Sequence, residues 1–349
     1  MRYLAAAAEL GHQLEAAGEF VAGLALHAAT DEGSEVDGRS AATFVILAGV
    51  GASLGSRRAR ESASPVERRR AQGTLAKRSL FLFVIGWAFF TIWPADILHY
   101  YGVYLAIGSV VLFAPSRRLL TLAAMSVVVS FVFIVAFDPL ANWNLDGYSY
   151  RGLSTPEGFA RNLLFDGFHP VFPWIAFYLF GMWLGRTDLA DPVWRRSLMI
   201  RAAIVIAVTE GAAWVMLGPK GSSLNDIDVR SWRWLFSVEP IPPLPLYALA
   251  GAGTAVLVIC GSIWLGERLP QKATEPFVSA GQLALTIYLA HVLIGMVVLD
   301  TFDRLEDQTL GWAVLTSLIF SSVAVVLSWA WRRRFSRGPL EAVMRRVAG

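Results

Sequence analysis

The sequence has very little cysteine and little charge. Cys260 is the single cysteine and lies inside an apolar segment, so an intramolecular disulfide and a cysteine metal site are both excluded. Charged residues make up 16% of the 349 positions, whereas hydrophobic residues make up 55%. This balance is too apolar for an ordinary soluble protein and is typical of a polytopic membrane protein.

Three common catalytic signatures are also missing: a Gly-rich phosphate loop, a Ser-His-Asp order and an HExxH motif. The formal net charge of +3 is small and gives no indication of a nucleic-acid partner. The partner that the composition predicts is the lipid bilayer. No metal site is predicted, because the histidines and aspartates lack a specific ligand spacing.

The most informative stretch is residues 165–186, which read FDGFHPVFPWIAFYLFGMWLGR. Its apolar part is roughly 26 Å long as a helix, close to the ~30 Å thickness of the hydrocarbon core. Pro170 and Pro173 fit the first turn of this helix, where a missing N–H costs nothing. Gly181 and Gly185 form a face on which a second helix can pack closely. The stretch therefore predicts a membrane span with a polar outer end.

Similar apolar segments recur along the chain and predict an all-α, polytopic transmembrane helical bundle with no soluble domain. Residues 1–39 are an N-terminal segment whose first 29 residues either span the membrane or lie at the interface. The bundle is predicted over 40–331, followed by a basic cytoplasmic tail at 332–349. Nine spans are predicted, or ten if 1–29 crosses the membrane: 40–55, 79–93, 97–114, 119–137, 168–185, 198–217, 244–265, 277–299 and 310–331.

The loops alternate in charge. One set holds 22 of the 30 Lys and Arg residues and 7 acidic residues, whereas the other holds 7 basic and 16 acidic residues. The positive-inside rule places the basic set, which includes 56–78 and 332–349, in the cytoplasm. The C-terminus is therefore predicted inside and residues 30–39 outside.

This orientation brings two Asp-x-x-His pairs to the same side of the membrane. Asp96 precedes His99 by three residues, and Asp166 precedes His169 by the same spacing. At i and i+3 on a helix the two side chains share a face, and a carboxylate beside an imidazole makes it a better base. The alternative is that both aspartates cap helices and both histidines are interfacial polar residues.

Two further ionisable residues lie in the middle of predicted spans. Glu210 and His291 sit at a depth where such groups are costly and usually face a bundle interior or a cavity. We interpret them as substrate-binding or proton-relay residues, and the alternative is a structural hydrogen bond to a neighbouring helix.

Four runs of the sequence are DILHYYG at 96–102, GFHPVFPW at 167–174, GQLALTIYL at 281–289 and RGPLE at 337–341. Together they resemble the YeiB-like family of bacterial membrane proteins. This family is similar to heparan-α-glucosaminide N-acetyltransferase. The resemblance implies a bundle of about ten spans that moves an acyl group from acyl-CoA to an extracytoplasmic acceptor, often a sugar, and acetyl-CoA is the donor we expect by this resemblance.

The first span departs from the family pattern. Family members usually carry Asp-x-x-Arg-Gly there, whereas residues 19–27 read EFVAGLALH. His27 matches the catalytic histidine of the acetyltransferase by position only, with Asp37 downstream. By this resemblance His27 and Asp37 join His99, Asp96, His169 and Asp166 as candidate catalytic residues.

Together these observations predict an acyltransferase in the bacterial plasma membrane, acting on an envelope glycan or a lipid-linked sugar. The alternative is a proton-coupled transporter or flippase of a small molecule or envelope precursor, in which Glu210, His291 and the Asp–His pairs relay protons. A non-catalytic scaffold is the third interpretation. Whether the chain forms a homodimer is left open.

Overall fold

The computed structural model describes residues 34–90, 92–93, 96–144, 149–218, 232–302 and 310–349. The chain forms two compact units. Unit 1 comprises Met1–Leu47, Leu189–Ile206 and Gly251–Arg346, and unit 2 comprises Ala48–Asp188, Ala207–Ala250 and Val347–Gly349. The domain boundaries predicted after residues 39 and 331 do not coincide with these divisions and stay predictions.

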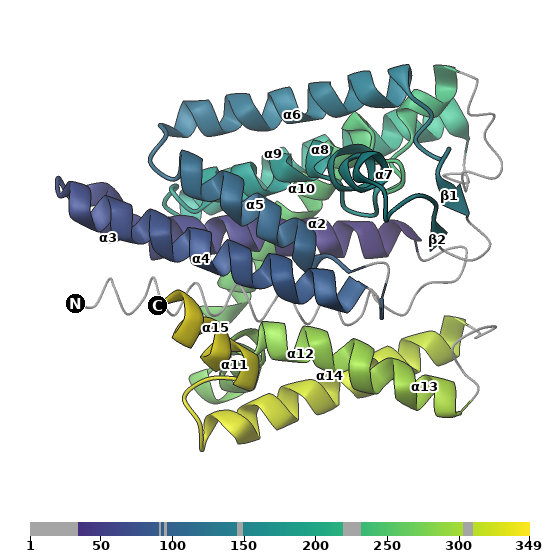
Figure 1. Cartoon of the computed structure of the whole chain (residues 1–349). Coiled ribbons are helices and arrows are strands. Elements are labelled where there is room, and N and C mark those ends of the chain that lie inside the picture. The colour runs from purple at the N-terminus through teal and green to yellow at the C-terminus, as the bar shows by residue number, and fades with distance from the viewer. Residues whose placement is uncertain (1–33, 91, 94–95, 145–148, 219–231, 303–309) are drawn as a thin grey trace. The chain divides into compact units, whose positions relative to one another are not determined.

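Unit 2 contains most of the candidate catalytic residues. Its helices are labelled in Figure 1. They are α3 (Arg57–Glu61), α4 (Pro65–Phe90), α5 (Leu98–Val111), α6 (Ser116–Ala136), α7 (Pro156–Arg161) and α8 (Val171–Leu184). A π-helical turn (Asn162–Asp166) follows α7, and a 3₁₀ turn covers Trp232–Phe236. The described strands, β1 (Trp143–Asn144) and β2 (Ser149–Tyr150), form a small antiparallel pair.

Unit 1 contains the C-terminal helices. They are α11 (Gln271–Gly281), α12 (Ala284–Ala290), a π-helical turn (His291–Met296), α13 (Val297–Thr301), α14 (Leu310–Arg332) and α15 (Pro339–Ala348), whose last two residues belong to unit 2. Three long helices contribute residues to both units: α2 (Ser34–Gly55), α9 (Pro192–Leu217) and α10 (Pro245–Gly266). Within unit 1, Arg195 of α9 forms a bidentate ion pair with Glu267 at 2.7 and 2.5 Å, just after α10 ends.

The structure confirms an all-α, multi-pass membrane protein. Seven described helical segments are long and apolar enough to cross a membrane, and there are eight if the bent pair 156–166 and 171–184 counts as one span. Two of the nine predicted spans are therefore shorter than expected. The helix within 97–114 has only 14 residues, about 21 Å, and the helix within 168–185 meets the length only with α7.

The glycine face predicted on α8 packs against α2. Gly49 of α2 lies so close to α8 that an added Cβ would stand 2.1 Å from the carbonyl oxygen of Tyr178. An added Cβ at Gly185 would stand 2.9 Å from the carbonyl oxygen of Val50. The hydroxyl of Ser53 donates to the carbonyl oxygen of Met182 at 2.5 Å. These contacts confirm that small residues let the two backbones approach closely.

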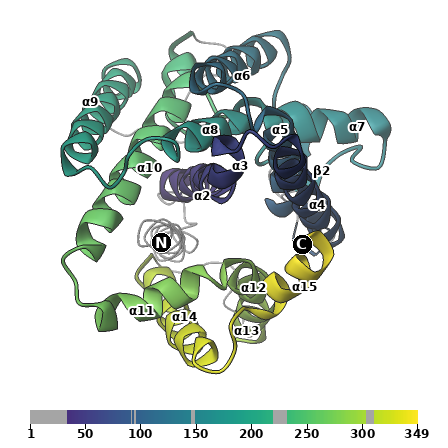
Figure 2. The ribbon, with the colours of Figure 1, turned by 90° about the vertical axis from the view of Figure 1, so that its left-hand side faces the viewer.

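Helix α8 also packs against α5 and α6, beside which it lies in Figure 2. Ser126 of α6 donates to the carbonyl oxygen of Pro173 at 3.3 Å. Gly108 of α5 leaves room for the ring of Tyr178, because an added Cβ would stand 2.5 Å from that ring. The core of unit 2 is therefore built around the stretch that the sequence marks as most informative.

The start of α8 differs from the prediction. Pro170 precedes the helix, and Phe172 has φ −102° and ψ 119°, which are not helical values. The Phe172–Pro173 peptide bond is cis. The prediction that both prolines lie in the first turn of a regular helix is therefore wrong, and a bend of 47° separates α8 from the helix before it.

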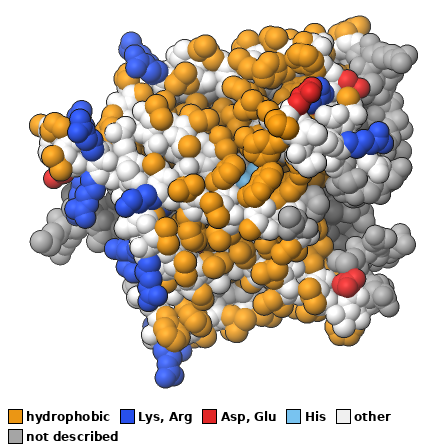
Figure 3. All heavy atoms as spheres, viewed as in Figure 1, with side chains coloured by type: hydrophobic (Ala, Val, Ile, Leu, Met, Phe, Trp, Pro, Cys, Tyr) orange, Lys and Arg blue, Asp and Glu red, His pale blue; other side chains and the backbone are white. Residues whose placement is uncertain are grey.

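The surface of unit 2 carries the charge pattern of a membrane protein. On the face seen in Figure 3, apolar side chains cover its helices, and Lys and Arg side chains gather where α3 and α4 meet. The large exposed apolar side chains include Leu80, Val84, Met125 and Val128. Apolar side chains along the helices suit contact with lipid tails, and basic side chains at the helix ends suit the polar interface of the membrane.

In unit 1 a carboxylate from the C-terminal segment caps α12. Glu341 accepts the backbone N–H of Thr286 at 3.0 Å and the hydroxyl of Thr286 at 2.6 Å. The backbone N–H of Leu340 donates back to the Thr286 hydroxyl at 3.2 Å. An added Cβ at Gly338 would stand 2.0 Å from the Glu341 carboxylate, so a larger residue does not fit. These contacts join two of the runs on which the family resemblance depends.

We expect Glu341→Gln to destabilise the protein by about 1–3 kcal/mol. The Gln amide has one acceptor oxygen, so one of the two Thr286 donors would face an N–H group instead of an acceptor. Glu275→Gln, at an exposed position of α11, is the matched control and should change stability little. Thermal unfolding in detergent measures both changes. Equal melting temperatures for the two variants would contradict the capping role.

Candidate functional site

The first Asp-x-x-His pair forms the predicted contact. The Oδ2 atom of Asp96 lies 3.1 Å from Nδ1 of His99 and also accepts the backbone N–H of His99 at 3.3 Å. Both side chains are almost completely buried, at 0% and 1% exposure. Because Asp96 accepts the Nδ1 proton, the Nε2 atom of neutral His99 is left as the proton acceptor. The carboxylate thus supports the first turn of α5 and orients the imidazole.

Helix α4 closes this pair on one side. An added Cβ at Gly86 would stand 2.2 Å from the backbone nitrogen of His99 and 2.8 Å from Oδ2 of Asp96, so only glycine fits. The rings of Trp87 and Phe90 meet the His99 ring edge-on, at centroid distances of 6.3 and 5.1 Å. This aromatic enclosure keeps the buried imidazole in a surrounding of low polarity.

The second Asp-x-x-His pair does not form the predicted contact. The carboxylate of Asp166 accepts the hydroxyl of Tyr150 at 2.6 Å and pairs with Nε of Arg161 at 2.5 Å. The prediction that Asp166 orients His169 is therefore wrong. The i and i+3 rule requires a continuing helix, whereas here the helix ends in a π-helical turn at Asp166 and the chain bends before α8.

Asp166 instead ties the strand pair to the bent helix. Its carbonyl oxygen accepts the indole N–H of Trp143 in β1 at 2.6 Å, and Arg161 also donates to the carbonyl oxygen of Asp138. Burial and the hydrogen bond to Asp166 raise the pKa of Tyr150 far above its ordinary value. The phenol therefore stays protonated and keeps donating to the carboxylate.

His169 lies at the bend and has an unused ring nitrogen. Its Nδ1 atom is buried and has no hydrogen-bond partner among the described residues. The ring packs edge-on against Trp174 at 4.5 Å, and the hydroxyl of Tyr104 donates to the carbonyl oxygen of His169 at 2.5 Å. The side chain as a whole is only half-buried, in contrast to His99.

Tyr100 lies between the two histidines. Its ring centroid is 3.9 Å from that of His99 and 6.1 Å from that of His169. Its hydroxyl donates to Oδ1 of Asn162 at 2.9 Å, and Gly167 leaves room for that hydroxyl. The two motifs are thus joined through one phenol. Sequence reasoning missed Tyr100 and Asn162, although Tyr100 directly follows His99 in the DILHYYG run.

The other candidate residues lie elsewhere or outside the described part. His27 is not among the described residues, and of Asp37 only the backbone is described, in α2. Glu210 is half-buried in α9, within unit 2. His291 belongs to unit 1, and its Nδ1 lies 2.5 Å from the carbonyl oxygen of Tyr288, one turn earlier. That contact lies within its own helical segment, so neither the relay role nor the predicted alternative of a bond to a neighbouring helix is tested by it.

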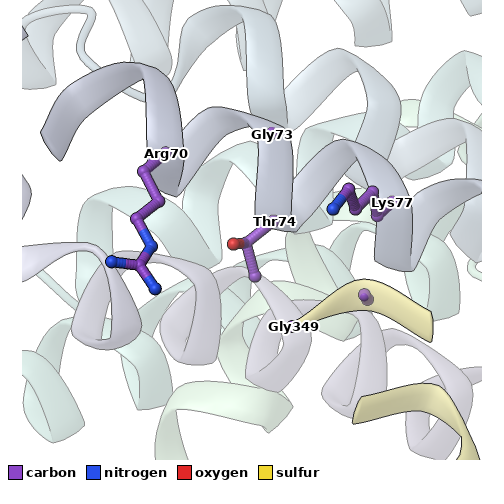
Figure 4. A pocket seen from close by; sticks show the side chains of 6 residues that line it. Arg70, Gly73, Thr74, Lys77 and Gly349 are labelled. Carbon is purple, nitrogen blue, oxygen red and sulfur yellow. The ribbon is translucent and has the colours of Figure 1, made fainter. Parts of the chain in front are cut away.

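Among the described residues, neither a metal site nor the pocket beside α4 adds to this arrangement. In the part of the chain that is described, no three His, Cys, Asp or Glu side chains are grouped as metal ligands would be. A pocket of about 280 Å³ borders α4 in unit 2, lined by Arg70, Gly73, Thr74, Lys77, Ala348 and Gly349 (Figure 4). Its side chains include no imidazole or carboxylate, and the charged ones are the cations Arg70 and Lys77.

Comparison with known protein families shows to which family the chain belongs. A family model described as heparan-alpha-glucosaminide N-acetyltransferase, catalytic, matches residues 19–215, more than half of the chain. The chain belongs to this acetyltransferase family. A second model, described as a protein of unknown function (DUF418), matches residues 182–349. The two matches confirm the YeiB-like resemblance. No curated protein matches the chain.

The acetyltransferase match includes every member of the histidine cluster. Asp96, His99, Tyr100, Asn162 and His169 all lie between residues 19 and 215. His291 and the Glu341 cap lie only in the DUF418 match. The cluster in unit 2 is therefore the part of the molecule in which acetyltransferase-like chemistry is to be sought.

Proposed function

We propose that the chain is a membrane acyltransferase that moves an acetyl group from acetyl-CoA to a hydroxyl or amine of an extracytoplasmic sugar or envelope acceptor. The observation that carries this proposal is the position of His99 and His169 on either side of Tyr100. Family membership supplies the reaction class, and the cluster supplies groups that move a proton.

In this proposal His169 is the general base. Its imidazole, whose buried Nδ1 has no hydrogen-bond partner among the described residues, accepts the proton of the acceptor group while the acceptor oxygen or nitrogen attacks the thioester carbonyl carbon. The carbon–sulfur bond then breaks, and the thiolate of CoA leaves. His99, held by Asp96, is the second base of the cluster, and the aromatic rings around it exclude water.

The experiment that tests this function incubates purified protein with acetyl-CoA labelled in the acetyl group and with cell-envelope fractions. Label should appear in an envelope glycan or lipid-linked sugar and should disappear when both histidines are replaced by alanine. Absence of transfer by the unmodified protein, together with uptake of label into vesicles, would overturn the proposal in favour of a transporter.

We further propose that the protein lies in the bacterial plasma membrane with its C-terminus in the cytoplasm. In a background with Cys260→Ser, a cysteine at Ser62 or Ala342 should react with a membrane-impermeant reagent only after permeabilisation. A cysteine at Ser154 should react in intact cells. The basic loops favour this orientation. Labelling of position 62 in intact cells would reverse the orientation.

A further inference from the structure

Two arginines of unit 2 lie where α2, α5 and α8 end. Arg60 of α3 donates through NH1 to the carbonyl oxygen of Ser53 at 2.5 Å and to the hydroxyl of Ser56 at 2.7 Å. Arg186 follows α8 and donates to the carbonyl oxygens of Ala114 at 2.6 Å and Leu112 at 3.0 Å. Both side chains are half-buried. Carbonyls at the ends of α2 and α5 thus hold two guanidinium groups in place.

Close packing brings the two arginines to the same place. Gly185 precedes Arg186, and an added Cβ there would stand 3.0 Å from Cβ of Ser53, whose carbonyl oxygen binds Arg60. Burial, and next the charge of Arg186, lower the pKa of Arg60 to about 10. The two guanidinium groups are therefore close enough to repel each other.

The nearby carboxylates leave this charge largely uncompensated. Glu61 is hydrogen-bonded to Nε of Arg57 at 2.8 Å, and Asp188 acts on Arg57 as well. Glu61 also acts on Arg60, but only at longer range. The Nε atom of Arg186 is buried and has no hydrogen-bond partner among the described residues. Helix ends carry only partial negative charge, so two full positive charges exceed what the carbonyls supply.

We propose that Arg60 and Arg186 form a binding site for a phosphate group. Guanidinium N–H groups match phosphate oxygens in geometry, and a dianion would relieve the repulsion between the two cations. The positive-inside rule places this end of the bundle in the cytoplasm. Two ligands that contain phosphate can reach it there: CoA and the headgroup of an anionic lipid. The CoA assignment rests on the proposed function, whereas the phosphate chemistry does not.

The test measures binding without any acceptor. Calorimetry on purified protein in a neutral detergent compares CoA with its analogue lacking the 3′-phosphate. A second arm measures retention of phosphatidylglycerol against phosphatidylcholine in mixed nanodiscs. The variants are Arg60→Gln and Arg186→Gln. A third variant, Arg60→Lys, keeps the positive charge but removes the paired N–H groups of the guanidinium. Arg57→Gln is the matched control, because Arg57 lies exposed in the same helix and is already paired with Glu61.

We expect Arg60→Gln and Arg186→Gln to weaken one phosphate ligand by about 10-fold or more, with Arg57→Gln unchanged, since a charge-assisted hydrogen bond is lost. Loss confined to CoA assigns the site to the donor, and loss confined to phosphatidylglycerol assigns it to lipid. Unchanged binding of both ligands in Arg60→Gln and Arg186→Gln, with melting temperatures intact, overturns the proposal. A protein that binds CoA through Arg60 and yet transfers no label keeps this inference and overturns only the proposed function.

Discussion

Replacing His169 by alanine should lower acyl transfer by about 100-fold or more, the scale expected for loss of a general base. The side chain is half-buried at a bend, packs against Trp174 with one ring edge and makes no hydrogen bond through Nδ1 among the described residues. Little folding energy therefore depends on it. The measurement is the initial rate of label transfer per folded molecule, with folding followed by size exclusion and thermal unfolding.

His291→Ala is the matched control, because it removes a half-buried histidine whose Nδ1 contacts a carbonyl oxygen of its own helix. Its rate per folded molecule should stay close to that of the unmodified protein. If His169→Ala unfolds the protein while the rate per folded molecule is preserved, His169 is a structural residue. The role of base would then pass to His99 or His27.

Replacing Asp166 by alanine should destabilise the protein by about 1–3 kcal/mol, the cost of leaving a buried hydrogen-bond donor without its acceptor. The Asp166 side chain is completely buried, and its loss leaves the Tyr150 hydroxyl and Nε of Arg161 without this acceptor. The strand pair would keep the bond from Trp143 to the backbone of residue 166 but lose the bond from Tyr150. The expected reading is a fall in melting temperature in detergent, with activity falling in parallel.

Asp166→Asn should cost less, since the amide oxygen still accepts one of the two hydrogen bonds. Glu157→Ala is the control, because Glu157 is exposed in α7 and should leave the melting temperature unchanged. A stable Asp166→Ala protein with a strongly reduced rate would show instead that the carboxylate acts on the reaction and that the anchoring role is wrong.

The two Asp-x-x-His pairs show how far sequence reasoning reaches. Both have the same spacing, yet only Asp96 contacts its histidine, because α5 starts between them and continues. After Asp166 the chain leaves the helix, and the carboxylate meets Arg161 and Tyr150 instead. The same spacing gives a contact where the aspartate stands just before a helix that contains the histidine, and none where the chain leaves a helix between the two residues. Nothing in the sequence marks the π-helical turn that makes this difference.

The predicted spans illustrate the same limit. Apolar runs located nearly every long helix, because burial in lipid requires them. They did not locate helix ends: α4 begins at Pro65, whereas the apolar run begins near residue 79. A polar stretch of good helix formers continues a helix beyond the membrane as readily as an apolar one does. Partners such as Tyr100 and Asn162, 62 residues apart, depend on tertiary packing that no local pattern encodes.

The Glu341 cap has a consequence for the order in which the molecule is made. The first turn of α12 depends on a carboxylate that lies 55 residues further along the chain. At the usual ~5–20 residues per second of synthesis, Thr286 is made about 3 to 11 s before its acceptor. During that interval the helix start is held by water or by other partners. A nascent chain that stops before Glu341 already carries α14 but lacks this cap, so the first turn of α12 obtains its capping carboxylate only after α14 has been made.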